Sequence, residues 1–482
     1  MFYPNIEKIS KYYDKYTHIP LVYEQHYETK DIVSIYNKYK DKYSMLLETS
    51  TDIYGNNITI ITTMCSSNYK VIDNEVYIDN KKINTGIIDS LKDYLDFSSP
   101  KYDNLDVFTG GVVGHFNYET FSLFENIQMN NKVEHDLPMI CLMKINDLIV
   151  INHDTNKLYF ISNIDTSDDI KNAYTKAEQA IIKMIENYKQ ITYVDFCYIK
   201  NSNDITSNFT QKEFVDRVNK AKEYIYNGDI FQVVLSQRLT CSYEQDPLNA
   251  YKKLNINTKS LYKYNMIFDN YSIVGVSPEE LLQIRDNKLK TIPIAGTRRR
   301  GNNNKEDKLI EQDLLSDKKE VAEHMMLVDL GRNDIGKVSK IGSVYVKNLL
   351  NIKKYESVMH ITSEIESTLD NNKNMIDALG SMLPAGTLSG APKIKACSII
   401  EELENVKREA YGGALAFIGF NSLFNTCITI RTMIFKDNKV SIQAGAGIVK
   451  DSIAINEYNE TLQKANVLLK AILGDNYDYI NR

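Results

Sequence analysis

The sequence contains no tryptophan, and its cysteines are too widely spaced to predict disulfide cross-links. The six cysteines stand at scattered positions, none of them in a CxxC pair: Cys65, Cys141, Cys197, Cys241, Cys397 and Cys427. Disulfide frameworks and thiolate zinc sites need closely paired spacings, so the sequence favours neither. The seven histidines are equally spread out.

Long apolar runs and an excess of positive charge are also missing. No uninterrupted apolar stretch approaches the roughly 20 residues that a membrane helix requires. Residues 1–16 lack the apolar core and the cleavage site of a signal peptide. The net charge is −6 and there is no basic tail, so the sequence lacks the positive charge that binds a nucleic-acid backbone. We therefore expect a cytoplasmic protein that binds neither membrane nor nucleic acid.

The remaining composition is that of a large globular protein with helices and strands. The chain has 482 residues, 43% of them hydrophobic, which is enough for two substantial cores or one very large one. Helical periodicity predicts helices at 165–189, 308–330, 375–383, 393–403 and 456–473, and a capping box of Thr210 and Glu213 opens another that ends at Gly228. Strand patterns occur at 230–235, 271–276, 289–294, 414–419, 427–435 and 440–443, with a hairpin turn at 435–439. These patterns predict an α+β fold with large, mostly antiparallel sheets covered by helices, and a polar linker at 200–208.

Two pairs of glutamates stand out because each pair shares one face of a predicted helix. Glu320 and Glu323 are three residues apart, as are Glu457 and Glu460, and Lys464 lies on the same face as the second pair. Carboxylate oxygens on two helices suit a hard cation such as Mg²⁺. The spacing alone favours solvated surface charge, since glutamates three apart are common on exposed helices, and a metal site stays open as the alternative at this point.

Glycine-rich segments are the other concentrated feature. They occur at 293–301, 384–393 and 443–449, where backbone N–H groups could receive an anion, although each is also typical of a tight turn. Arg431 lies in a segment that alternates like a strand. Its guanidinium either faces solvent or points into a cleft, where it would bind a carboxylate with two hydrogen bonds.

As an ordered set, these segments resemble the chorismate-utilising enzymes, and among them anthranilate synthase component I. The matching runs lie within residues 210–470: PIAGTRRRG, EVAEHMMLVDLGRND, ESVMHITSEIE, PAGTLSGAPKIKA, YGGALAFIGF, ITIRTMIF, QAGAGIVKDS and EYNETLQKA. Residues 45–49, MLLET, resemble a landmark of the family's smaller domain. The resemblance implies a four-layer α/β/β/α sandwich, with an N-terminal regulatory domain over 1–200 and a chorismate-binding catalytic domain over 205–475.

The resemblance also implies roles for individual residues. Glu323 and Glu460 match direct Mg²⁺ ligands, and Glu320 and Glu457 match residues that reach the metal through water. The positions that match binders of the substrate's carboxylates and pyruvyl arm are Gly296, Thr297, Tyr411, Arg431, Gly445, Ala446, Gly447 and Lys464. His360 and Thr387 match residues near the reacting ring, and Glu320 is the expected proton donor to the leaving hydroxyl.

The implied reaction is that of a lyase: chorismate and ammonia give anthranilate and pyruvate, the first committed step of L-tryptophan biosynthesis. Relatives that use a lysine as nucleophile or base carry it where this chain has Ala295 and Gln232, so ammonia is the expected nucleophile. No cysteine lies in a Gly-x-Cys-x-Gly elbow, which implies a separate glutaminase subunit that supplies ammonia. An aminodeoxychorismate synthase component I and a catalytically inactive binding subunit are the alternatives.

A tryptophan feedback site is the last feature that the resemblance implies. Its expected residues are Glu48, Thr49, Leu261, Tyr262 and Lys263. The second segment lacks both prolines of the family's pattern, and proline fixes the backbone φ angle, so the geometry of this loop departs from that of the family. L-Tryptophan is the expected inhibitor.

Overall fold

The structure is a computed structural model that describes residues 2–51, 57–103, 105, 107–195, 204–355 and 358–474. Within these ranges, no helix is both long and apolar enough to cross a membrane. The described cysteines are free thiols, as the sequence predicts, and Cys197 lies outside the described residues.

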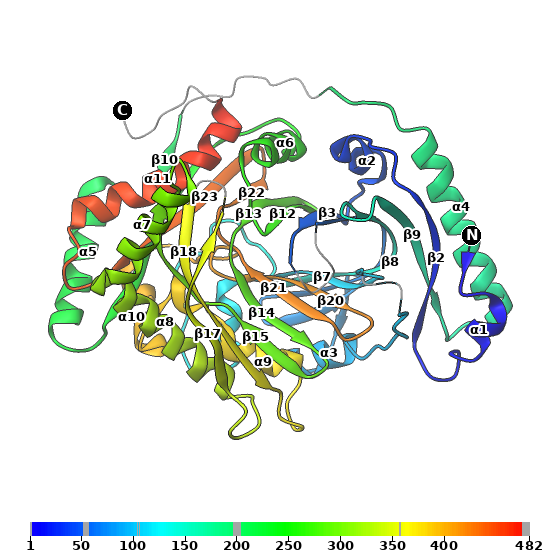
Figure 1. The fold of residues 1–482 in the computed structure, drawn as a ribbon, viewed down its shortest axis with the longest axis horizontal. Helices are drawn as coiled ribbons and strands as arrows, with labels where there is room; N and C mark the ends of the chain where they lie inside the picture. Colours follow the sequence, from blue (N-terminus) through cyan, green and yellow to red (C-terminus); the bar gives the residue numbers. More distant parts are fainter. Residues whose placement is uncertain are drawn as a thin grey trace.

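Helices are interspersed among runs of strands throughout the described part of the chain (Figure 1). The first part contains β1 (Phe2–Tyr3), α1 (Ile6–Ser10), β2 (His18–His26), α2 (Ile32–Tyr39), β3 (Ser44–Thr49), β4 (Ile58–Ile72), β5 (Glu75–Ile78), β6 (Lys81–Ile83), α3 (Ile87–Tyr94), β7 (Gly111–Phe116), the 3-10 helix η1 (Tyr118–Leu123), β8 (Ile140–Asn152), β9 (Lys157–Asp165) and α4 (Ile170–Lys189). The middle part contains β10 (Thr206–Ser207), α5 (Gln211–Tyr226), β11 (Gln232–Ser242), α6 (Pro247–Asn257), β12 (Tyr262–Phe268), β13 (Tyr271–Ser277), β14 (Glu280–Arg285), β15 (Lys288–Thr291), β16 (Ile294–Arg299), α7 (Asn304–Ser316) and α8 (Lys318–Gly336). The last part contains β17 (Tyr345–Lys354), β18 (Val358–Thr368), α9 (Met375–Met382), the 3-10 helix η2 (Gly386–Leu388), β19 (Gly390–Ala391), α10 (Lys393–Leu403), β20 (Ala414–Gly419), β21 (Phe424–Ile428), β22 (Thr432–Lys436), β23 (Lys439–Ile448) and α11 (Ala454–Leu473).

The strands form one antiparallel ladder that folds back on itself. Its order is β11–β23–β22–β13–β12–β3–β4–β8–β7–β20–β21–β14–β15–β18–β17. Strands from the first 200 residues therefore lie in the middle of the ladder, where β3 pairs with β12 and β7 pairs with β20. The division into domains at 1–200 and 205–475 stays a prediction, and residues 196–203, at its boundary, lie outside the described residues.

Three apolar layers separate the four layers of secondary structure. One cluster packs α2, α4, α6 and α11 onto one half of the ladder, and a second packs α3, α8, α9 and α10 onto the other half. The third cluster contains strand and loop residues and lies between the two sheet halves. Leu46 belongs to the first cluster, whereas its neighbours Met45 and Leu47 belong to the third, as the two-residue period of a strand requires. The predicted four-layer α/β/β/α sandwich is confirmed, and Figure 1 shows helices on both outer sides of the strands.

Several predicted elements are found with their expected bounds or nearly so. Helix α10 and strand β20 match to the residue, and the capping box of Thr210 and Glu213 opens α5. The hairpin turn between β22 and β23 is also confirmed, with Asp437 and Asn438 both at positive φ, as a type I′ turn requires.

Three predicted elements are each interrupted, which corrects the sequence interpretation. The helix expected at 308–330 is two helices, because the Asp317 carboxylate caps the first N–H groups of α8 directly after α7 ends. The strand expected at 289–294 is divided between β15 and β16 at a proline, Pro293. The strand expected at 427–435 is divided between β21 and β22 near Arg431.

Candidate active site

The two predicted glutamate pairs lie on α8 and α11 and act on one another electrostatically. Burial raises the pKa of Glu323, and the charges of Glu320 and Glu460 raise it further. Burial likewise raises the pKa of Glu457, and the neighbouring Glu460 adds to this rise. Glu323 of α8 therefore lies within electrostatic reach of Glu460 of α11. Solvated charges on unrelated surfaces would not perturb each other in this way.

This cluster has the donor chemistry of a site for a hard divalent cation. Its side chains offer only carboxylate oxygens, which Mg²⁺ prefers, and their mutual repulsion is the kind of unbalanced charge that a cation removes. Two basic side chains form ion pairs with these glutamates: Lys464 Nζ is 2.8 Å from Glu460 Oε1, and Arg298 Nη1 is 3.3 Å from Glu320 Oε1. Among the described residues, no three acidic, histidine or cysteine side chains are already arranged around a common point as metal ligands.

A β-bulge in β16 holds the segment around Gly296 against His360. The register between β16 and β18 shifts between Ala295 and Thr297, and Gly296 takes a positive φ of 69° at the shift. The Gly296 carbonyl oxygen is 3.1 Å from His360 Nδ1, and Thr297 Oγ1 is 3.0 Å from the same nitrogen. A hydrogen bond to a carbonyl oxygen requires the proton on Nδ1, which leaves Nε2 unprotonated in the neutral ring.

The charge state of His360 follows from its surroundings. Burial lowers the pKa of this histidine; the hydrogen bond to Gly296 opposes the shift, and the nearby charge of Arg431 adds to it. His360 is therefore a neutral imidazole near pH 7, with one nitrogen free to accept a proton.

Glu279 is a candidate functional residue that the sequence analysis did not select. It follows Pro278 in the turn between β13 and β14, and its Oε1 accepts a hydrogen bond from Thr387 Oγ1 at 2.9 Å. Burial raises its pKa to about 7, although Thr387, Arg431 and Lys464 all favour the charged form. A carboxyl group in the short turn between two strands is the sequence pattern that could have drawn attention to it.

Arg431 does not lie within a continuous strand, contrary to the sequence interpretation. It stands between β21 and β22 with a φ of 48°, in the left-handed region that side chains other than glycine seldom adopt. The residue is exposed to solvent. Partial burial of its guanidinium nevertheless lowers the pKa of that group, and the charge of Glu279 opposes the shift. Arg431 thus stands within electrostatic reach of both Glu279 and His360.

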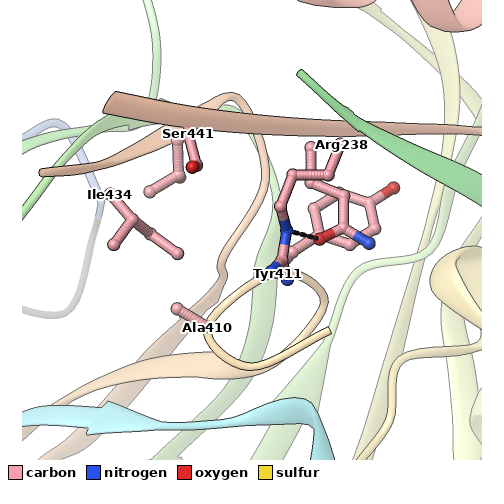
Figure 2. A pocket seen from close by; sticks show the side chains of 7 residues that line it. Arg238, Ala410, Tyr411, Ile434 and Ser441 are labelled. Atoms are coloured by element: carbon pink, nitrogen blue, oxygen red, sulfur yellow. Dashed lines mark hydrogen bonds between the residues drawn. The ribbon is translucent and has the colours of Figure 1, made fainter. Parts of the chain in front are cut away.

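The glycines of β23 allow several groups to approach the backbone closely. A Cβ added at Gly445 would lie 2.8 Å from Tyr411 Oη, and Lys464 Nζ donates a hydrogen bond to the Gly445 carbonyl oxygen at 2.9 Å. Ala446 is fully buried between these glycines. Tyr411 also lines a small buried cavity with Arg238, Ile434 and Ser441, in which Arg238 Nε donates to Gln443 Oε1 (Figure 2).

Gln232 and Ala295 stand where the resemblance implies a lysine in those chorismate-utilising enzymes that use one as nucleophile or base. Gln232 is buried at the start of β11, and its Nε2 lies 2.6 Å from the place that a Cβ on Gly447 would take. Its Oε1 is buried without a hydrogen-bond partner among the described residues. Ala295 precedes the bulge at Gly296 in β16. Neither side chain is a nucleophile or a base at neutral pH.

Comparison with known proteins identifies the family. The profile of the chorismate binding enzymes matches residues 56–470. The chain belongs to the chorismate-binding enzyme family. Anthranilate synthase component 1 of Acetivibrio thermocellus is 39% identical over 98% of this chain and 99% of its own length. The same component of Lactococcus lactis is 44% identical over 76% of this chain and 80% of its own length.

A solved structure agrees with these relatives. The crystal structure of anthranilate synthase component I from Streptococcus pneumoniae superposes with a TM-score of 0.78 at 34% identity, covering 85% of this chain and 92% of that one. Within the chorismate-binding enzymes, the chain therefore belongs to the anthranilate synthase component 1 group. The predicted resemblance is confirmed.

The residues expected to bind L-tryptophan lie on two strands of this chorismate-binding enzyme but face opposite sides of the sheet. Glu48 of β3 and Lys263 of β12 are paired and face α6, where Glu48 Oε1 accepts hydrogen bonds from Tyr251 and Asn255, and Lys263 Nζ donates to Asn255 at 2.6 Å. Thr49 pairs with Tyr262 on the opposite face.

On that opposite face, Tyr262 is fully buried and its hydroxyl donates to Glu280 at 3.1 Å. Leu261 is half-buried at the edge of β12, where its carbonyl oxygen accepts from Ser50 N. The structure therefore brings Glu48 and Lys263 together under α6 and keeps the side chains of Thr49 and Tyr262 apart from them.

Proposed function

We propose that the protein is a lyase that converts chorismate and ammonia to anthranilate, pyruvate and water. The proposal rests on the following arrangement: Lys464 pairs with Glu460 of α11 and, with Arg431, lies within electrostatic reach of Glu279, and no lysine stands at position 232 or 295. Cationic groups suit a substrate with two carboxylates. The missing lysines leave added ammonia as the nucleophile.

We assign the metal site to the four glutamates. Glu323 and Glu460 would hold Mg²⁺ directly, and Glu320 and Glu457 would hold it through water, after Lys464 releases Glu460. A bound Mg²⁺ would neutralise the ring carboxylate of chorismate and stabilise negative charge that develops on it. The protein then contributes the orientation of its carboxylates and the exclusion of competing cations.

The substrate's second carboxylate and its enolpyruvyl arm are assigned to the other side of the site. The guanidinium of Arg431 can bind a carboxylate with two hydrogen bonds. Lys464 lies beside the Gly445 carbonyl oxygen and supplies a second positive charge. Tyr411, Thr297, Gly296 and the backbone from Gly445 to Gly447 complete the set.

We assign to Glu279 the role of proton donor to the C4 hydroxyl as it leaves. Ammonia forms a bond to C2, the ring double bonds shift, and the C4–O bond breaks as the hydroxyl takes a proton from Glu279 and departs as water; the ammonium group formed at C2 then loses one proton, which replaces the proton that Glu279 gave up. A carboxyl group with a pKa of about 7 carries that proton in a large share of molecules near neutral pH. Glu320, the donor expected from the sequence, instead forms an ion pair with Arg298 at 3.3 Å. Thr387 orients the Glu279 carboxyl through its hydrogen bond.

The second step is assigned to His360. Its unprotonated Nε2 takes the proton from C2, the bond between C3 and the enolpyruvyl oxygen breaks, and the departing enol picks up a proton to become pyruvate. The ring becomes aromatic as anthranilate. A His360→Ala variant that formed anthranilate at the full rate would remove this residue from the mechanism.

A partner and an inhibitor complete the proposal. The name of the relatives, component 1, implies a second component, and we propose that it is a glutaminase subunit that supplies ammonia from glutamine. We further propose L-tryptophan as a feedback inhibitor that binds near Glu48 and Lys263. The cytoplasmic location stays a prediction of the sequence.

A product assay tests the proposed function. The purified protein is incubated with chorismate, Mg²⁺ and ammonium at alkaline pH, and fluorescent anthranilate is recorded with pyruvate as the second product. A Glu323→Gln variant serves as the control for metal dependence. Anthranilate without an added lyase supports the proposal, and para-aminobenzoate that appears only after a lyase is added would assign the chain to aminodeoxychorismate synthesis. No turnover under any condition would leave a binding subunit.

A separate titration tests the inhibitor. Because the chain contains no tryptophan, added L-tryptophan is the only indole in the sample. Saturable binding of L-tryptophan that Glu48→Ala abolishes is the expected result. Binding that is unchanged in this variant would place the inhibitor elsewhere.

A further inference from the structure

Three residues on adjacent strands form a row that ends beside Arg431. Tyr264 of β12 pairs with Gly275 of β13, and Gly275 pairs with Thr432 of β22. The central glycine leaves its face of the sheet empty, so the phenol of Tyr264 lies across it. The hydroxyl oxygens of Tyr264 and Thr432 are 2.6 Å apart, and both residues are buried. A Cβ added at Gly275 would lie 2.6 Å from Thr432 Oγ1 and 2.7 Å from Tyr264 Oη.

Two successive hydrogen bonds connect the Tyr264 hydroxyl, through Thr432, to the backbone beside Arg431. Thr432 Oγ1 donates its single proton to the Ile430 carbonyl oxygen at 2.7 Å, so it accepts the proton of Tyr264. This arrangement ties the residue after Arg431 to the residue before it. The Arg431 carbonyl oxygen accepts from Val276 N at 3.1 Å, and together these bonds enclose a residue whose φ is 48°.

We propose that Tyr264 is a positioning residue for Arg431. Its hydroxyl holds Thr432 in the rotamer that closes the 430–432 turn, and this turn keeps Arg431 in the left-handed conformation that directs its guanidinium toward Glu279 and His360. The inference rests on the proposed function, in which Arg431 binds a carboxylate of the substrate. Tyr264 itself is buried and touches no substrate.

The perturbation is Tyr264→Phe, which removes one hydroxyl and keeps the ring over Gly275. Tyr36→Phe is the matched control, because Tyr36 is also fully buried and its hydroxyl lies 2.9 Å from that of Ser44. Steady-state rates of anthranilate formation are measured against chorismate at saturating ammonium and Mg²⁺. Because Arg431 holds the substrate in the ground state and the transition state alike, we expect KM for chorismate to rise about threefold to tenfold in Tyr264→Phe with kcat nearly unchanged. Tyr36→Phe keeps the wild-type KM.

Substitutions of Thr432 decide the question if Tyr264→Phe folds poorly. Thr432→Val removes the hydroxyl at nearly constant shape and should raise KM as Tyr264→Phe does, whereas Thr432→Ser keeps the hydroxyl and should restore a KM near that of the wild type. In an Arg431→Ala background, Tyr264→Phe should have no further effect on KM.

Several results would overturn the inference. Equal KM values for Tyr264→Phe and Tyr36→Phe would do so, as would equal KM values for Thr432→Val and Thr432→Ser, or an undiminished effect of Tyr264→Phe without Arg431. In each of these cases an active wild-type protein leaves the proposed function standing. A wild-type protein that forms no anthranilate would overturn the proposed function and this inference together.

Discussion

The protonation of Glu279 provides the sharpest test of the site. Burial raises the pKa of this carboxyl from 4.5 to about 7. The shift corresponds to a preference of about 3 kcal/mol for the neutral form relative to a solvated glutamate. If the neutral form delivers the proton to the leaving hydroxyl, activity must fall as pH rises through this pKa. We therefore expect kcat/KM to decline above about pH 7, by about tenfold for each further pH unit.

Two substitutions make the prediction quantitative. Glu279→Gln keeps the shape but cannot donate a proton, so we expect a loss of about 100-fold to 10,000-fold in kcat/KM and no decline above neutral pH. Thr387→Val removes the hydrogen bond that favours the Glu279 anion. The pKa of Glu279 should then rise further, and the decline should move to higher pH by up to about one unit.

The assay has to separate this decline from the titration of ammonium. Anthranilate fluorescence is recorded at low chorismate over a range of pH values, and each rate is divided by the concentration of unprotonated ammonia at that pH. If the wild-type rate divided by the concentration of unprotonated ammonia stays constant through neutral pH, Glu279 is not the acid. A decline that moves to lower pH in Thr387→Val would refute the electrostatic reasoning.

Three further predictions follow from other parts of the structure. Glu323→Gln and Glu460→Gln should each raise the Mg²⁺ concentration for half-maximal activity about 10-fold to 100-fold, and a metal titration with unchanged midpoints would contradict the assigned ligands. Gly445→Ala should lower kcat/KM by more than about tenfold, because its Cβ would lie 2.8 Å from Tyr411 Oη, and wild-type kinetics would show that β23 adjusts freely. Burial raises the pKa of Glu119 to about 7, so its stabilising effect is complete below the unfolded value of 4.5 and is lost as pH rises through 7. The advantage of Glu119→Gln in unfolding temperature over the wild type should therefore grow between about pH 4.5 and pH 7 and stay constant above pH 7, and thermal unfolding curves that coincide at alkaline pH would contradict this.

Local patterns in the sequence were sufficient for many helices and turns. The capping box of Thr210 and Glu213, the bounds of α10 and the hairpin turn at Asp437 and Asn438 depend on neighbours a few residues away. The glutamate pairs on α8 and α11 belong to the same class, because a helix places residues three apart on one face whatever surrounds it. The family resemblance supplied the link between these two helices.

Other features depend on contacts between segments far apart in the chain. The strand pattern around Arg431 is interrupted because Thr432 bonds to Tyr264 from a distant strand and closes a turn, and no local rule contains that partner. Burial raises the pKa of Glu279, and the Thr387 hydroxyl that donates a hydrogen bond to it comes more than 100 residues later in the chain. The opposite orientations of Glu48 and Tyr262 follow from the register of β3 with β12, which the two sequences do not reveal separately.

The amino-acid sequence by itself therefore determined the class of the fold, most of its helices, and the presence of paired carboxylates and glycine-rich turns, since these depend on periodicity and on the conformational preferences of single residues. Tertiary structure alone decided which carboxyl group keeps its proton, how Arg431 is directed, and which side chains share a face. Burial and strand register set these properties, and both exist only after distant segments have packed together.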